Sequence, residues 1–177
     1  ELGVSVQFEE QGIDTSKVSS EMVTAIMASL AQKGSESISG NVRWGVQKRM
    51  EDGTYVASSA PYGYRLVNLR LEIQPEEAEI VRWIFQQYLA GASVNEITKE
   101  LNTRSAGNNH KWYKAAVIYI LSNERYIGDC LWQKCYMTST VPARQVINRG
   151  EKTQYYAEGK HPAIIDKDTF YAAQRLR

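Results

Sequence analysis

The pattern of apolar and polar positions changes its period several times along the 177-residue chain, and each change predicts a different element. Near the start, "GVSVQFEE" places Val4, Val6 and Phe8 on one side and polar residues on the other. This alternation with period two predicts a half-buried strand. The polar loop "QGIDTSKVSS" follows, and its serines can cap the next helix.

The next segment carries apolar or small residues three or four positions apart, which predicts one stripe along a helix of about thirty residues. Such a helix would be roughly 45 Å long, so we expect the stripe to pack on another subunit or along an extended ligand. Three glycines interrupt the helix, although each costs roughly 1 kcal/mol relative to alanine. The stripe consists of Val23, Met27, Leu30, Gly34, Ile38, Val42 and Gly45, and the third glycine is Gly40.

The middle of the chain predicts a hairpin and a second helix. "GYRLVNLRLEI" is typical of two short strands, and "QPEEAEIVRWIFQQYLAG" is typical of a helix. Pro75 suits the first turn of that helix, and Gly91 can end it. We expect its core face to consist of Ile80, Trp83, Ile84, Tyr88 and Leu89.

The last third predicts short helices around a strand. "SVNEITKELN" is a helix capped by Ser93, "WYKAAVIYILSN" is another, and "YIGDCLWQKCYM" alternates like a strand. Residues 138–160 are polar and basic, which favours a loop. A short strand and a final helix, capped by Asp166 or Asp168, complete the chain. The fold class is therefore α+β, with a long helix followed by a mixed, mainly helical domain with a small antiparallel sheet.

Charge is unevenly distributed, although the net charge is only +1. Residues 1–40 hold two basic and six acidic residues, whereas residues 103–160 hold nine basic and four acidic residues. Such blocks suggest that particular faces meet a polyanion. Ordinary variation of a protein surface remains an alternative.

Catalytic and metal-binding patterns are weak. The sequence has no apolar run long enough to cross a membrane and no phosphate-binding glycine loop, and we expect no signal peptide. Cys130 and Cys135 would point to opposite faces of a strand, which is poor for chelation. We expect no catalytic residue, no metal, no other cofactor and no membrane contact in this chain.

Nucleic-acid binding fits the basic segments better, since duplex DNA is read through Lys and Arg contacts to phosphate. The two helices of residues 93–102 and 112–123 resemble a helix-turn-helix with a long turn, in which "HKWYK" would enter the major groove. A helical hairpin with a buried Trp112 is an equal alternative. The candidate DNA-binding residues are Arg43, Lys48, Arg49, Tyr64, Arg65, Lys111, Trp112, Lys114 and Arg125.

Several motifs, in this order, resemble the large serine recombinases of phages and mobile elements. They are "FEEQGIDTS", "MASLAQKGSESISGNVRWGVQKR", "APYGYRL", "PEEAEIVRWIFQQYLAGASVNEITKELN" and "ILSNERYIGD". In that family a long helix joins the catalytic domain to the DNA-binding domain, packs on partner subunits and lies across the minor groove. The family commonly has Glu where this chain has Gly34 and Gly40.

The resemblance implies a DNA-binding fragment that recognises an attachment half-site and positions a catalytic domain whose nucleophilic serine lies outside this sequence. We expect this fragment to be inactive alone. It further implies a remnant of the catalytic domain in 1–18, the connector helix in 19–52, and the recombinase DNA-binding domain in 53–136. A basic loop and strand–helix in 137–177 would lead towards a zinc ribbon that the sequence lacks.

The resemblance also implies partners: a double-stranded DNA attachment site, and self-association as a dimer or tetramer in the full-length protein, in a bacterial cytoplasm. Two other classes remain open. A helix-turn-helix transcriptional regulator would use the long helix as a dimerisation arm, and a protein-interaction module would carry its basic blocks incidentally. A stable dimer on a palindromic site would favour the first, and indifference to DNA at low salt the second.

Overall fold

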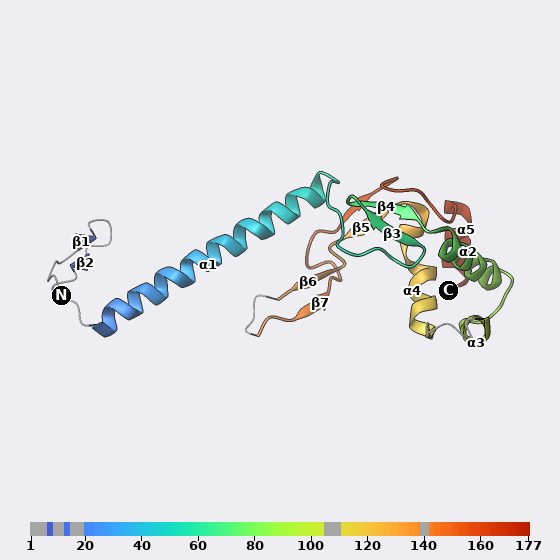
Figure 1. Ribbon diagram of the computed structural model, residues 1–177, viewed down its shortest axis with the longest axis horizontal. Coiled ribbons are helices and arrows are strands. Elements are labelled where there is room, and N and C mark those ends of the chain that lie inside the picture. The colour runs from blue at the N-terminus through green and yellow to red at the C-terminus, as the bar shows by residue number, and fades with distance from the viewer. Residues whose placement is uncertain (1–6, 9–12, 15–19, 105–110, 139–141) are drawn as a thin grey trace. The chain divides into compact units, whose positions relative to one another are not determined.

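The computed structural model describes residues 7–8, 13–14, 20–104, 111–138 and 142–177 (Figure 1). The chain divides into two units, Glu1–Arg49 and Met50–Arg177, and each is described by itself. The predicted α+β class is confirmed. The domain boundaries predicted at residues 18, 52 and 136 stay predictions.

The first unit contains a two-stranded antiparallel ladder and most of the long helix. Strands β1 (Gln7–Phe8) and β2 (Ile13–Asp14) pair, and the rest of the predicted first strand lies outside the described residues. Helix α1 (Ser20–Glu51) has 32 residues and is therefore about 48 Å long. The described residues of its stripe are exposed except for the half-buried Gly45, and large apolar side chains at the surface include Met27, Leu30, Ile38, Val42 and Trp44.

A hairpin opens the second unit after the long helix. Strands β3 (Tyr64–Val67) and β4 (Arg70–Ile73) pair antiparallel, as predicted. The two turn residues, Asn68 and Leu69, both have positive φ, at 48° and 61°. Two-residue turns of this kind match the twist of the strands that they join.

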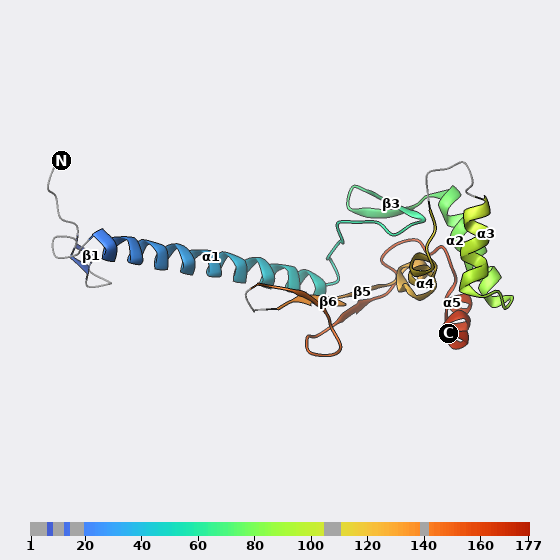
Figure 2. The ribbon, with the colours of Figure 1, turned by 90° about the horizontal axis from the view of Figure 1, so that it is seen from below.

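Four helices form the body of the second unit: α2 (Pro75–Leu89), α3 (Val94–Arg104), α4 (Lys114–Ser122) and α5 (Lys167–Leu176). Helix α2 contacts the other three, and Figure 2 shows α4 beside them. The caps predicted for α3 and α5 are confirmed: Ser93 and Glu96 form a reciprocal capping box at α3, and Asp166 accepts a hydrogen bond from the Thr169 N–H at α5. Ser16 and Ser19, either of which was expected to cap α1, lie outside the described residues.

The core lies where these helices meet, and its α2 face differs from the prediction. The buried residues of α2 are Ala78, Val81, Ile84 and Phe85, whereas the predicted Ile80, Trp83, Tyr88 and Leu89 are only partly buried at its edge. Because α2 packs against three helices at once, three aliphatic side chains and the Phe85 ring occupy the centre of its apolar arc. The Trp83 and Tyr88 rings cover the margin, where the Arg104 guanidinium lies 4.2 Å from the Trp83 ring centroid.

The segment between α4 and α5 holds more strands than predicted. A 3-10 turn, η1 (Glu124–Ile127), precedes β5 (Cys130–Trp132) and β6 (Cys135–Met137), so the single strand predicted here is broken in two. The predicted loop also contains β7 (Gln145–Ile147) and β8 (Tyr155–Ala157), which pair with β6 and β5 respectively. The prediction of an unstructured loop was wrong, as was the short strand before α5, where residues 162–166 form no strand.

Candidate nucleic-acid interface

The start of α4 is held in place by the last turn of α3. The Asn102 side chain accepts a hydrogen bond from the Trp112 N–H (2.9 Å) and donates one to the Trp112 carbonyl oxygen (3.0 Å). This pair of bonds fixes the backbone just before α4, which begins at Lys114. His110, which was expected in this turn, lies outside the described residues.

Side chains in this turn alternate between core and surface. Trp112 is 3% exposed and meets the Tyr62 ring edge-on at 4.9 Å, whereas Lys111, Tyr113 and Lys114 are exposed. The Lys111 ammonium lies 5.6 Å from the Tyr113 ring centroid. The turn therefore presents two cations and one aromatic ring on the outside of a backbone that two hydrogen bonds hold in place.

Two of the residues predicted to contact DNA, Tyr64 and Trp112, lie in the core and not at the surface. Trp112 is buried as described, and Tyr64 is 4% exposed. The Tyr64 hydroxyl donates to the Pro162 carbonyl oxygen at 2.8 Å, and burial raises the pKa of this hydroxyl. Because neither side chain presents surface to a ligand, we assign both of them to the stability of the unit.

The outer face of α4 adds residues that the sequence did not single out. Ile118 and Tyr119 are 42% and 53% exposed, and Ala115 is exposed beside them. The opposite face, with Val117, Ile120 and Leu121, is buried. Since α4 is apolar around most of its circumference, its periodicity could not show which residues face outward. We call Ala115, Ile118 and Tyr119, together with Lys111 and Lys114, the α4 surface.

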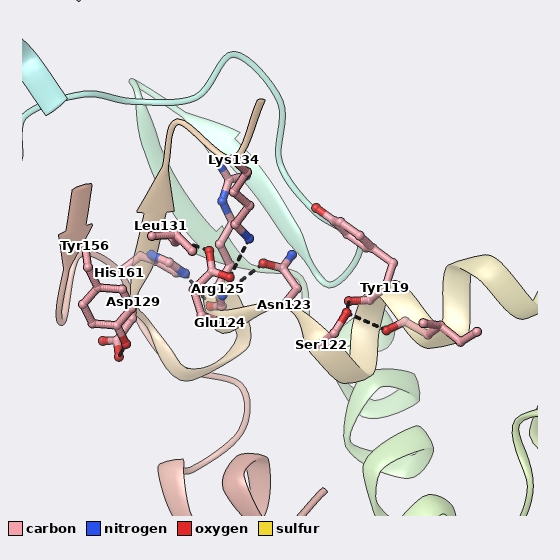
Figure 3. A network of polar contacts seen from close by, with 11 residues as sticks. Tyr119, Ser122, Asn123, Glu124, Arg125, Asp129, Leu131, Lys134, Tyr156 and His161 are labelled. Atoms are coloured by element: carbon pink, nitrogen blue, oxygen red, sulfur yellow. Dashed lines mark hydrogen bonds and ion pairs between the residues drawn. The ribbon is translucent and has the colours of Figure 1, made fainter. Parts of the chain in front are cut away.

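Arg125 lies in η1 and is fixed through its backbone. Its carbonyl oxygen accepts a hydrogen bond from His161 Nε2 at 2.6 Å, and its N–H donates to the Asn123 side chain at 3.2 Å. Its guanidinium donates to the Ser59 carbonyl oxygen at 3.2 Å. Figure 3 shows Glu124, Arg125 and His161 close together in this network. The guanidinium therefore has a defined position beside the segment that follows α1.

The adjacent carboxylates are engaged elsewhere. Glu124 accepts hydrogen bonds from the Leu131 N–H (3.0 Å) and from the Lys134 ammonium (2.6 Å). Asp129 is buried and accepts hydrogen bonds from the Tyr156 hydroxyl and the Gly159 N–H. These bonds hold the pKa of Asp129 below its usual value, against the effect of its burial.

The remaining predicted cations lie at the surface. Arg65 forms an exposed cross-strand ion pair with Glu72 at 3.0 Å, which offsets part of its charge. In the first unit, Arg43 donates to the Ser39 carbonyl oxygen of its own helix, and Lys48 and Arg49 are exposed in the last turn of α1.

Other kinds of site find little support. Among the residues that the structure describes, no three His, Cys, Asp or Glu side chains are grouped to hold a metal ion. The Cys130 thiol lies 3.9 Å from His161 Nδ1, and burial raises its pKa. None of the described helices is long and apolar enough to cross a membrane.

Comparison with known proteins gives consistent relatives. The uncharacterised protein YbcK of Escherichia coli K12 is 27% identical over 162 residues, which is 86% of this chain and 29% of YbcK. A solved structure of an LSR–DNA complex is similar with a TM-score of 0.53 and 23% identity, over 77% of this chain and 37% of the other. A structure from work on the sequence requirements of the Listeria innocua prophage attP site is similar with a TM-score of 0.53 and 22% identity, over 77% and 50%.

These likenesses cover only part of each relative, since the chain spans half or less of their lengths. The two solved structures show that the fold is shared. The family model described as Recombinase matches residues 75–177. This range includes helices α2 to α5, the turn η1 and strands β5 to β8. The resemblance to large serine recombinases stated from sequence is thereby confirmed, and this chain belongs to the Recombinase family.

Proposed function

We propose that the Met50–Arg177 unit binds double-stranded DNA at one half of a recombination site. The observation that carries this proposal is the α4 surface on a chain of the Recombinase family. Within the described part of the chain, no carboxylate pairs with Lys111 or Lys114, so both charges are available to a polyanion. The similarity to a structure of an LSR–DNA complex supports the same conclusion.

Contacts at the start of α4 would fix the register on DNA. The N-terminal end of a helix carries partial positive charge, and the lysines at this end add two full charges, so phosphate is favoured there. Ala115 and Ile118 offer apolar contact for a thymine methyl group, and the Tyr119 hydroxyl offers a hydrogen bond to a base edge. The lysines would supply affinity and the outer face of α4 would supply sequence preference.

Helix α1 would connect this unit to the catalytic domain that a serine recombinase uses to exchange DNA strands. Its basic residues Arg43, Lys48 and Arg49 would add phosphate contacts, and its exposed apolar residues would pack on a second copy in the full-length protein. In such a protein the serine hydroxyl would attack a DNA phosphate and form a phosphoserine link, while a P–O bond to deoxyribose breaks and the cut strand leaves with a free sugar hydroxyl. These activities would take place on bacterial DNA in the cytoplasm.

The experiment is a selection of duplexes from a random pool, followed by fluorescence anisotropy on the selected duplex over about 50–200 mM salt. We expect the logarithm of the association constant to fall linearly with the logarithm of the salt concentration. The variants Lys111→Glu and Lys114→Glu should each weaken binding and lower the salt slope by about 1. The control is Lys99→Glu, which reverses an exposed charge on α3 outside the α4 surface.

Equal losses in all three variants would mean that the α4 surface has no particular role. A chain that binds no duplex even at the lowest salt would contradict the proposed function. A selected site that is palindromic and bound by a stable dimer would favour the transcriptional regulator instead.

A further inference from the structure

A second cationic site, which shares no residue with the α4 surface, is a pocket of about 420 Å³. Its walls are the segment after α1, the β3–β4 turn with the start of β4, η1, β5 and the residues that follow β8. Pockets of about 300–1,000 Å³ hold small ligands or parts of larger ones. All of the lining residues belong to the Met50–Arg177 unit, so this unit forms the pocket alone.

The charge of the pocket is entirely positive. Arg70, Arg125 and Lys160 line it, and none of the described lining residues is Asp or Glu. Of the carboxylates next to lining residues in the sequence, Glu124 and Asp129 are held by other donors as described above, and Glu72 pairs with Arg65. Three cations from distant parts of the sequence therefore face one cavity with no bonded anion in the described structure.

The pocket is also built to a defined shape. The Arg125 guanidinium is fixed by its bond to the Ser59 carbonyl oxygen. The Lys160 ammonium lies against the backbone at Gly53, where an added Cβ would come within 2.9 Å of it. The Tyr55 ring meets the Trp132 ring edge-on at 6.1 Å, which holds the segment after α1 against β5.

We propose that this pocket binds a phosphate group of the DNA backbone, with Arg125 as the fixed donor and with Arg70 and Lys160 as the two further cations. Guanidinium groups match the geometry of phosphate oxygens, and a lysine adds a point charge without strict geometry. The inference rests on the proposed DNA binding and adds a second point of attachment on the same unit. Two separated attachment points would fix the orientation of the unit on the duplex as well as its position.

The test uses the 177-residue chain and the double variant Arg70→Gln/Lys160→Gln. Arg125 is left intact because it also holds the segment after α1. The matched control is Lys99→Gln/Lys152→Gln, which removes two exposed charges outside both proposed surfaces. We expect the pocket variant to lower the salt slope by about 1 to 2 and the control to leave it nearly unchanged. Thermal unfolding should be the same for all three proteins, since the substituted side chains are exposed.

A methylphosphonate scan of the selected duplex then locates the phosphate. We expect at least one position where the uncharged methylphosphonate weakens binding of the wild-type chain but not of the pocket variant. If every position affects both proteins equally while the wild-type chain binds DNA, the pocket proposal fails and the proposed function stands. If the wild-type chain binds no DNA, both fail. Chemical-shift changes at Gly53 and Lys160 with inorganic phosphate, without any such position on DNA, would show a small-anion site and overturn the backbone assignment.

Discussion

Helices α1 and α2 show two different ways in which one chain specifies a helix. Helix α2 has 15 residues and buries four of them to 1% exposure or less. Helix α1 has 32 residues, and none of its described side chains is buried. The fold of α2 is therefore supported by tertiary packing, whereas α1 depends on local helix propensity within this chain.

The glycines sharpen this difference. An added Cβ at Gly34 or Gly40 would meet no atom within 4 Å, so nothing in the described structure requires a glycine there. At Gly63, just before β3, an added Cβ would come within 2.9 Å of Ile164 Cδ1 and 3.2 Å of Val81 Cγ2. Glycine thus weakens helix α1 and is required at Gly63. Substitution of glycine by alanine should therefore stabilise α1 and destabilise the second unit.

The largest expected effect is in the core of the second unit. Phe85 is 1% exposed and lies 6.1 Å from the Phe170 ring, centroid to centroid. Phe85→Ala should lower the free energy of unfolding of this unit by about 3–5 kcal/mol through lost burial and a cavity. Urea unfolding followed by tryptophan fluorescence measures this in a Trp44→Phe background, which removes the signal of α1. Amide exchange in α1 should not change, and a faster exchange there would show that α1 depends on the core.

Gly63→Ala should be the next most damaging. Gly63 has φ +92°, a region that costs an alanine roughly 1–2 kcal/mol, and overpacking adds roughly 1–3 kcal/mol. We expect a total loss of about 2–4 kcal/mol in the same urea assay. Gly91→Ala is the control, because Gly91 has φ +96° but open space around it, so only the backbone cost applies. Equal losses at the two positions would contradict the packing argument.

In α1 the same substitution should stabilise. Gly34→Ala and Gly40→Ala should each favour the helix by about 1 kcal/mol, because glycine has the greater backbone entropy to lose. The measurements are circular dichroism at 222 nm and amide exchange in α1 peptides, which should slow about fivefold for each substitution. A loss of helicity would mean that another copy of the chain packs closely on these glycines.

The smallest expected effect concerns pH. Burial lowers the pKa of His161 below its usual value of 6.5, so between the two pKa values the unfolded chain binds more protons than the folded one. The contribution of His161 to stability is therefore complete above about pH 6.5 and is lost as pH falls through the folded pKa. The urea concentration at which half of the second unit is unfolded should therefore be lower at about pH 5.5 than at about pH 7.5. His161→Gln, which keeps a donor for the Arg125 carbonyl oxygen, should reduce this change, and an equal change in the variant would assign it to other groups.

Features set by neighbouring residues could be predicted from sequence. Pro75 at the start of α2, the capping box of Ser93 and the Asp166 cap all act within one helical turn. The β3–β4 hairpin is equally local, since its strands are separated by two residues. These elements were predicted correctly because the deciding interactions span only a few positions.

Features that depend on residues far apart in the chain could not be predicted from sequence. Strand β8 has three residues in a polar segment, and it exists because β5, more than twenty positions earlier, supplies the hydrogen bonds. The burial of Trp112 depends on Tyr62 and Asn102, so the alternation of core and surface side chains in this turn could not be assigned. Arg70, Arg125 and Lys160 meet only in the folded unit, so the sequence gives no signal for their pocket.

The fixed position of Arg125 affects how selectively the unit could bind an anion. A surface arginine normally loses much rotational freedom when it binds, and that loss weakens the complex. Here the backbone of η1 and the bond to Ser59 have already removed part of that freedom during folding. An anion that reaches this guanidinium therefore meets a donor that is already oriented. Because the guanidinium cannot turn freely, it binds an anion of mismatched geometry more weakly.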